Sequence, residues 1–230
     1  MSNSKTFLEA QLELEGLKIT DDNKIVKIQT NHFDIEKKND SESPKVMAVK
    51  FDYKIEVFYS KLLPLEIVSK LEQLDKKTFF QETEKISEIL QKNNQFNDLG
   101  HYVAYIFPES FEMENTDTKV FTGSDDELIK EFDESFFKKF PMVYATMKGG
   151  KIVACCVSSR ESDRAGEAWI FTLPEYRKQG FGFKAVQLWA KELQKKGKFP
   201  FYTHEVSNIA SQKLAERLEL KKVFETISYE

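Results

Sequence analysis

Hydrophobic and polar residues alternate along residues 46–59, which predicts one strand with one buried face. The polar stretch EKKNDSESPK precedes it and is typical of a loop that leads from an earlier strand near residues 24–29. Two helices are predicted next, the first beginning at Pro64. Their apolar positions are Leu65, Val68, Leu71 and Leu74, then Ile86, Ile89 and Leu90. The stretch QKNNQFNDLG interrupts this pattern, and we place a domain boundary there.

Strands and helices alternate in the second half of the chain. HYVAYIF is predicted to be a strand, and Ser124 with Glu127 forms a capping-box pattern before a helix. That helix carries Leu128, Phe132, Phe136 and Phe140. The remaining elements are strands at 142–147 and 151–158 around the hairpin signal KGG, a strand EAWIFT, a helix at 180–196, a strand FPFYT, a helix at 208–218 and a last strand ending near Tyr229. This order predicts an α/β fold with a mixed sheet.

Composition narrows the class of protein. The chain has 230 residues, 40% apolar and 31% charged, enough for one large domain or one domain with an extension. Its net charge of −4 and lack of a long basic block argue against nucleic acid or a membrane as partner. No apolar run reaches the ~20 residues that span a bilayer, and the N-terminus does not resemble a signal peptide.

Cysteine and histidine add little chemistry. Cys155 and Cys156 are adjacent in an apolar run, which predicts a buried, reduced strand and a cytoplasmic location. The histidines, His32, His101 and His204, are scattered, so we expect no metal site.

The stretch PEYRKQGFGFKAVQLWA places two of the chain's 9 glycines at a predicted helix start, directly after a basic pair. A helix N-terminus offers unpaired N–H groups and partial positive charge, so this combination favours an anion over a simple tight turn. No Gly-Lys-Ser/Thr follows, which excludes a Walker loop. GFGFKA also satisfies a dinucleotide fingerprint with Glu205 as the ribose-binding acid, but LPEYRKQ separates it from its strand and too little chain follows.

With the residues around it, Arg-x-x-Gly-x-Gly resembles the pyrophosphate loop of the GNAT superfamily of acyl-CoA-dependent N-acetyltransferases. EAWIFTLPEYRKQGFGFKAVQLWA is similar to that family's fourth strand, loop and helix, and FYTHEVSNIASQKLAERLELKKV to its fifth strand and Asn-x-x-Ser helix. The resemblance covers residues 95–230 and implies a mostly antiparallel sheet that is splayed at the coenzyme site. Residues 1–94 form an N-terminal extension, which either covers the acceptor cleft and selects the substrate or only stabilises the protein.

The resemblance implies a coenzyme site for acetyl-CoA. Backbone groups of Phe171, Thr172 and Leu173 would position the thioester, while Asn208 and Ser211 cap their helix and also touch the coenzyme. The pyrophosphate would lie on Arg177, Lys178, Gln179, Gly180, Phe181, Gly182 and Phe183. We expect Gly182→Val to abolish coenzyme binding by projecting a side chain into the phosphate space.

Candidates for the chemistry are less distinct. Glu167 is the first choice for the base, although a solvated strand-end glutamate would look the same, and His204 is the second. Tyr202 and Tyr229 are candidate proton donors that packed aromatic residues would equally explain. Many relatives carry a Tyr acid where this chain has Ala215, and a Gly where it has Glu219.

The resulting expectation is an N-acetyltransferase that moves acetyl from acetyl-CoA to a primary amine, of a small molecule or a protein, by direct attack in a ternary complex. The absent Tyr keeps a second class open, a non-catalytic acyl-CoA-binding sensor. A homodimer also stays open.

Overall fold

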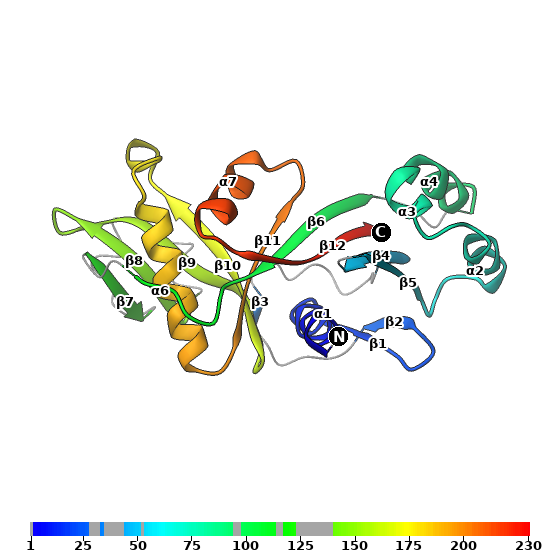
Figure 1. Ribbon diagram of the computed structural model, residues 1–230, viewed down its shortest axis with the longest axis horizontal. Helices are drawn as coiled ribbons and strands as arrows, with labels where there is room; N and C mark the ends of the chain where they lie inside the picture. The colour runs from blue at the N-terminus through cyan, green and yellow to red at the C-terminus, as the bar shows by residue number, and fades with distance from the viewer. Residues whose placement is uncertain are drawn as a thin grey trace.

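The computed structural model describes residues 2–27, 33–34, 44–51, 53–93, 98–113, 117–122 and 140–230 (Figure 1). In the first part of the chain the elements are α1 Ser2–Leu14, β1 Leu17–Ile19, β2 Lys24–Lys27, β3 Phe33–Asp34, β4 Val46–Phe51, β5 Lys54–Ser60, α2 Leu65–Glu72, α3 Thr78–Gln81 and α4 Thr83–Gln91. The second part holds β6 Leu99–Ile106, β7 Thr118–Thr122, β8 Met142–Lys148, β9 Lys151–Glu161, β10 Ala165–Thr172, the 3₁₀ turn η1 Pro174–Tyr176, α6 Phe181–Lys195, β11 Phe199–Glu205, α7 Ile209–Arg217 and β12 Lys221–Tyr229.

The strands of the described residues form one open sheet in the order β1-β2-β5-β4-β12-β6-β11-β10-β9-β8-β7, with β3 paired to β9. Neighbouring strands are antiparallel except in two pairs, β10 with β11 and β2 with β5. This confirms the predicted α/β class with a mixed, mostly antiparallel sheet. Helices α6 and α7 lie at one end of the elongated molecule and α2 to α4 at the other (Figure 1).

The two halves of the chain share this sheet. Strand β6 lies between β11 and β12, and β12 in turn pairs with β4. The strands that follow the predicted boundary are therefore hydrogen-bonded to strands that precede it.

Helix α1 was not anticipated from the sequence. Its Leu8, Leu12 and Leu14 are buried, and the ring of Phe7 meets that of Phe201 on β11 edge-on, with centroids 6.3 Å apart. Phe201 belongs to the core under α1, whereas the next residue, Tyr202, belongs to the core under α6 and α7. Since successive strand residues point to opposite faces, α1 covers one face of the sheet and α6 with α7 the other.

Three other predictions differ from the structure. Residues 46–59 form two antiparallel strands, β4 and β5, with Phe51 opposite Lys54 and a fully exposed Tyr53 at the turn. On α2, Val68 and Leu71 are buried as predicted, but Leu65 is 78% exposed and Ile67, which was not predicted, is buried as well. Strand β7 was not predicted, and the expected helix before Phe140 lies outside the described residues.

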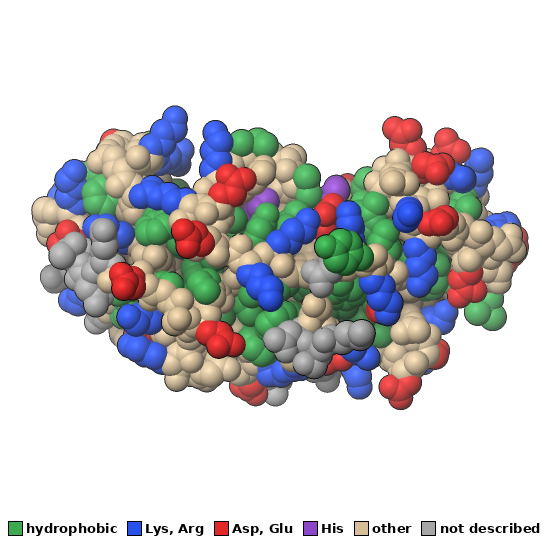
Figure 2. Space-filling view, viewed as in Figure 1, with side chains coloured by type: hydrophobic (Ala, Val, Ile, Leu, Met, Phe, Trp, Pro, Cys, Tyr) green, Lys and Arg blue, Asp and Glu red, His purple; other side chains and the backbone are tan. Residues whose placement is uncertain are grey.

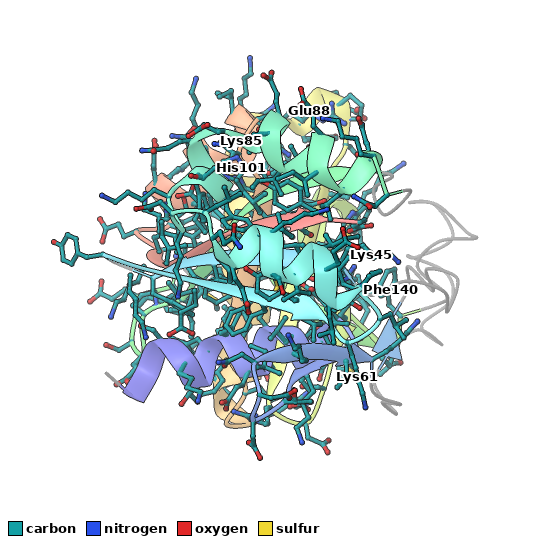
Figure 3. All side chains as sticks on the ribbon, turned by 90° about the vertical axis from the view of Figure 1, so that its right-hand side faces the viewer. Lys45, Lys61, Lys85, Glu88, His101 and Phe140 are labelled. Carbon is teal, nitrogen blue, oxygen red and sulfur yellow. The ribbon has the colours of Figure 1, made fainter. Side chains whose placement is uncertain are left out.

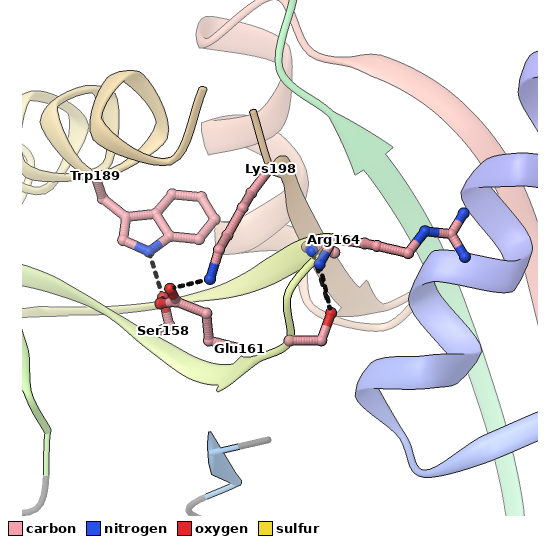
Figure 4. A network of polar contacts seen from close by, with 7 residues as sticks. Ser158, Glu161, Arg164, Trp189 and Lys198 are labelled. Carbon is pink, nitrogen blue, oxygen red and sulfur yellow. Dashed lines mark hydrogen bonds and ion pairs between the residues drawn. The ribbon is translucent and has the colours of Figure 1, made fainter. Parts of the chain in front are cut away.

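A partly buried polar network attaches α6 to the sheet (Figure 4). The indole Nε1 of Trp189 donates to Ser158 Oγ at 2.9 Å, and that hydroxyl donates to Glu161 Oε2 at 2.7 Å. Lys198 Nζ, just before β11, donates to Glu161 Oε1 at 2.8 Å. These contacts hold α6, β9 and the start of β11 together where β10 and β11 are still paired.

Candidate active site

Strands β10 and β11 begin as parallel neighbours and then separate. Their pairing runs from Ala165 opposite Phe199 to Glu167 opposite Phe201, although β10 continues to Thr172 and β11 to Glu205. The ladder between β10 and β9 has an irregularity between Glu167 and Ala168, where the separation starts. Because a bulge bends its strand and increases its twist, this local feature accounts for the opening.

Backbone groups of β10 face the opening. The N–H of Leu173 donates to the Val153 carbonyl of β9 at 3.0 Å. Strand residues alternate in the side to which they direct N–H and C=O, so Phe171 also faces β9, while Ile170 and Thr172 face the opening. In agreement, Nε of Arg177 donates to the Thr172 carbonyl at 3.1 Å.

This pattern changes the predicted thioester-positioning set. Thr172 remains, but the backbone groups of Phe171 and Leu173 belong to the ladder with β9. Ile170, which the sequence reasoning missed, is the other residue whose backbone groups face the opening. Backbone groups alternate in direction along a strand, so the direction of those of Ile170 could have been inferred once one hydrogen-bonded pair between β9 and β10 was known.

The glycine loop ends where α6 begins, with Gly180 as N-cap residue in the left-handed region at φ 87°. No side chain caps this helix end. The first N–H groups of a helix lack intrahelical partners, so those at Phe181, Gly182 and Phe183 can serve an anion. Thr146 on β8 holds the turn by donating from Oγ1 to the Phe181 carbonyl at 2.9 Å.

The structure adds a packing reason for glycine at position 182 to the one predicted from the sequence. A Cβ added there would lie 2.8 Å from Thr172 Oγ1 and 3.3 Å from Ile170 Cγ2. Its φ is not positive, so the backbone itself does not demand glycine. The direct packing of α6 on β10 is therefore sufficient reason for the missing side chain at this position.

Two cations that the sequence reasoning missed lie beside the loop. The Arg217 guanidinium carbon on α7 lies 4.7 Å from the Phe183 ring centroid, and a Cβ added at Gly180 would be 3.4 Å from Arg217 Nη2. Lys148 Nζ lies 5.3 Å from the Phe181 ring centroid. Neither forms an ion pair with a carboxylate of the described residues. Figure 2 shows basic side chains flanking the notch between the start of α6 and α7.

Tyr202 and His204 lie together on the α6–α7 face, on the part of β11 that has left β10. His204 directs Nδ1 to the Glu205 carbonyl at 2.8 Å, and its ring stacks on Tyr105 with centroids 5.5 Å apart. Its Nε2 is buried and has no hydrogen-bond partner among the described residues. Burial raises the pKa of Tyr202, while a hydrogen bond with the Ser211 side chain acts in the opposite direction.

Helix α7 closes over this strand. Asn208 caps it, since Oδ1 accepts from the Ser211 N–H at 3.0 Å, which confirms the predicted capping role. Ala215 is buried in the core shared by α6 and α7. Glu219 adopts φ 54° directly after this helix, so a non-glycine residue takes the left-handed conformation that glycine favours.

Glu167 lies on the opposite face, toward α1. It is 8% exposed, and its Oε2 accepts from Arg160 Nη1 at 3.0 Å. Its Oε1 accepts from Gln11 Nε2 of α1 at 3.2 Å. The predicted base is therefore a buried, paired carboxylate at the point where the strands separate.

The other candidates lie elsewhere. Tyr229 is removed from the candidate site, because β12 carries it into the core of α2 to α4, where its hydroxyl donates to the Phe79 carbonyl at 2.8 Å. His101 lies near α3 and α4 and contacts Glu225 Oε1 at 2.8 Å (Figure 3). Burial raises the pKa of both Cys155 and Cys156, which fits the predicted apolar, non-nucleophilic role.

The described parts of the chain show neither a group of metal ligands nor a membrane-spanning helix. No group of three or more His, Cys, Asp or Glu side chains there has an arrangement that could hold a metal ion. No helix in those parts has the length and apolar character to cross a membrane.

A parallel strand pair that opens beside a glycine-containing helix start is the arrangement that the sequence resemblance implied. The chain belongs to the GNAT acetyltransferase family, whose family model matches residues 20–229. The match therefore includes most of the segment before residue 95. Family membership supports an acetyltransferase activity.

Solved structures of the same superfamily are similar at a distance. A GNAT-family acetyltransferase from Colwellia psychrerythraea has 12% identity and a TM-score of 0.48, over 76% of this chain and 75% of that one. A GCN5-related N-acetyltransferase from Kribbella flavida has 13% identity and a TM-score of 0.46, over 100% and 96%. A GNAT-family protein from Novosphingobium aromaticivorans has 15% identity and a TM-score of 0.47, and the match covers 58% of this chain but only 65% of that one. A search of curated proteins gave no match.

Proposed function

We propose that the protein transfers the acetyl group of acetyl-CoA to a primary amine by direct attack in a ternary complex. The observation that carries the proposal is the opening between β10 and β11 beside the uncapped start of α6. Acetyl-CoA would supply an activated thioester carbonyl.

The chain's own groups fit such a ligand. The first N–H groups of α6, with Lys148 and Arg217 beside them, form an anion site for a pyrophosphate. Backbone groups of Ile170 and Thr172 are directed into the opening and can hydrogen-bond an extended chain with amide groups. Positioning the thioester at the opening would supply the proximity that acyl transfer needs.

The leaving thiolate needs a proton. Tyr202 is the best-placed hydroxyl for this role, since it lies on the coenzyme face of β11 and contacts Ser211 of α7. Tyr202 would act as the general acid in place of the Tyr that many relatives carry at the position of Ala215. We assign His204 to coenzyme contact through its buried Nε2 acceptor.

A second candidate function is an acyl-CoA-binding sensor without turnover, which Ala215 favours because the usual acid is absent there. Both functions require coenzyme binding, so only turnover separates them. In the transferase, the segment before residue 95 would cover the acceptor side through α1.

Binding is tested first. Calorimetry and thermal shift with acetyl-CoA should show saturable binding, with about 2.7 kcal/mol of stabilisation at 100-fold over the dissociation constant. No binding at millimolar acetyl-CoA would overturn both functions. Thiol release with a panel of amines and peptides, well above the hydrolysis seen without acceptor, would exclude the sensor. Binding without release from any acceptor would exclude the transferase.

A further inference from the structure

Two side-chain oxygen atoms on the α1 face of the sheet are buried and have no hydrogen-bond partner among the described residues. They are Oε1 of Gln11, on α1, and Oγ1 of Thr203, on β11. Gln11 as a whole is 3% exposed. Buried polar atoms are costly to leave unpaired, and most of those in folded proteins are paired. Two such atoms on one face point to a ligand that donates hydrogen bonds to both.

The amide of Gln11 is oriented by Glu167. Nε2 of Gln11 donates to Glu167 Oε1 at 3.2 Å, and the same carboxylate contacts Arg160 Nη1 at 3.0 Å. The amide cannot be turned round, because its oxygen would then face a carboxylate oxygen and neither atom can donate. The oxygen and nitrogen of an amide are about 2.3 Å apart, so Gln11 Oε1 lies within about 5.5 Å of Glu167 Oε1. The unpaired oxygen is therefore close to the carboxylate on β10.

Both oxygens lie near the place where β10 and β11 separate. Glu167 opposite Phe201 is the last pair of their parallel ladder. Thr203 follows Phe201 by two residues and points to the same face, and it pairs with Ala104, which belongs to the core under α1. One acceptor is thus on the β10 side of the opening and the other on the β11 side. Both are across the sheet from Tyr202.

The two acceptors suit the chemistry of a primary amine. In the neutral form that attacks a thioester, such an amine has two N–H groups and one lone pair. If each N–H donates to one of the two oxygens, the lone pair stays free for the attack. A secondary amine or an alcohol has only one hydrogen to donate and cannot serve both. The ion pair of Glu167 with Arg160 brings no net charge to this place, which favours a neutral ligand.

We propose that Gln11 and Thr203 bind the acceptor amine and select primary amines, an inference that rests on the proposed acetyl transfer. Gln11 Oε1 accepts one N–H of the amine and Thr203 Oγ1 accepts the other, while Nε2 of Gln11 remains on Glu167. Both are specificity-determining residues, since no bond forms or breaks at either. The segment before residue 95 then supplies half of the amine site through α1, and β11 supplies the other half.

Thr203→Val tests the site with little change in shape. Thiol release is measured with n-butylamine, benzylamine and lysine amide, and the amine that wild type acetylates fastest is used for all variants. We expect KM for this amine to rise roughly tenfold in Thr203→Val, because a hydrogen bond to the ligand is lost. The acetyl-CoA dissociation constant should not change. The Tm of the free protein should not fall, since the hydroxyl has no partner to lose.

Thr146→Val is the contrast for stability. Thr146 is buried as well, but its Oγ1 donates to the Phe181 carbonyl at 2.9 Å. This variant should therefore melt below wild type. An equal fall in Tm for Thr203→Val would show that its hydroxyl is already paired in the free protein, for example by an ordered water, and would overturn the proposal.

Gln11→Met tests the second acceptor, because it removes the amide and keeps the length of the side chain. KM for the amine should rise roughly tenfold here too. Gln187→Met is the matched control, since Gln187 is a buried glutamine of α6 whose Nε2 donates to the Glu112 carbonyl at 3.4 Å. It should keep the wild-type KM. The N,N-dimethyl derivative of the amine has no N–H in its neutral form, so its inhibition constant should stay at the wild-type value in Gln11→Met and Thr203→Val.

The failure of the site and the failure of the transferase give different results. Turnover by wild type, with an unchanged KM for the amine in Thr203→Val and Gln11→Met, would overturn the amine site and leave the transferase intact. Equal losses for the amine and its dimethyl derivative would also overturn it, because they would indicate a general distortion. No turnover by wild type with any of the amines would overturn the transferase, and the amine site with it.

Discussion

Replacing Gly182 by alanine should destabilise the protein, although alanine normally favours a helix. Its Cβ would lie 2.8 Å from Thr172 Oγ1 and 3.3 Å from Ile170 Cγ2. Overpacking of this kind costs about 1–3 kcal/mol, against a gain of roughly 0.5–1 kcal/mol from helix propensity. We therefore expect a net loss of about 1 kcal/mol, or roughly 2–4 °C in Tm.

Denaturant unfolding of a double-mutant cycle tests the cause. Thr172→Ala removes the Oγ1 that Cβ would meet, so it should recover much of the loss, with a coupling of about 1 kcal/mol. Thr172→Val keeps the volume and should recover nothing. If Gly182→Ala is as stable as wild type, or if Thr172→Ala and Thr172→Val restore its stability equally, the close contact between α6 and β10 is not what requires glycine.

Three further predictions concern the two faces of the sheet. Arg217→Gln should weaken acetyl-CoA binding about fivefold in calorimetry, and the loss of affinity should be smaller at high salt. The control Lys213→Gln, on the exposed side of α7, should bind like wild type. If Arg217→Gln also binds like wild type, Arg217 is not part of the site. Relative to Glu15→Gln, wild type should lose unfolding free energy as pH rises from 4.5 to about 7, because the folded pKa of Glu15 exceeds its ordinary value. A flat difference between the two in urea titrations would contradict this. Expression of residues 95–230 alone should give aggregated protein, since β12 loses β4 and Phe201 loses α1; a soluble, cooperatively melting fragment would show an independent domain.

The glycine loop and the elements on either side of it could be predicted from sequence because their residues are neighbours along the chain. Strand β10, the glycine loop and the start of α6 occupy one continuous stretch, 165–183. The packing role of Gly182 could not be predicted, since its contact with Thr172 forms only when α6 packs on β10. Arg217 comes from the end of the next helix, and nothing local marks it as a partner of Phe183.

The α1 face could not be predicted in the same way. Gln11 and Glu167 are 156 positions apart, and no spacing rule connects them. The hairpin β4–β5 was hidden because alternation continues through its turn and the turn carries no glycine. Helix α1 lacks a strong apolar stripe in its sequence, although Phe7, Leu8, Leu12 and Leu14 all pack in the same core.

The two faces are physically connected through β11. Phe201 packs against Phe7 of α1, while its neighbours along the strand, Tyr202 and His204, face α6 and α7. Protein interiors are close-packed, so a shift of α1 that moves Phe201 also moves the proposed proton donor. The same holds for β10, where Glu167 contacts Gln11 and the following residues line the opening. Helix α1 thus supports both strands that form the opening, and through it the segment before residue 95 contributes to the geometry of that opening.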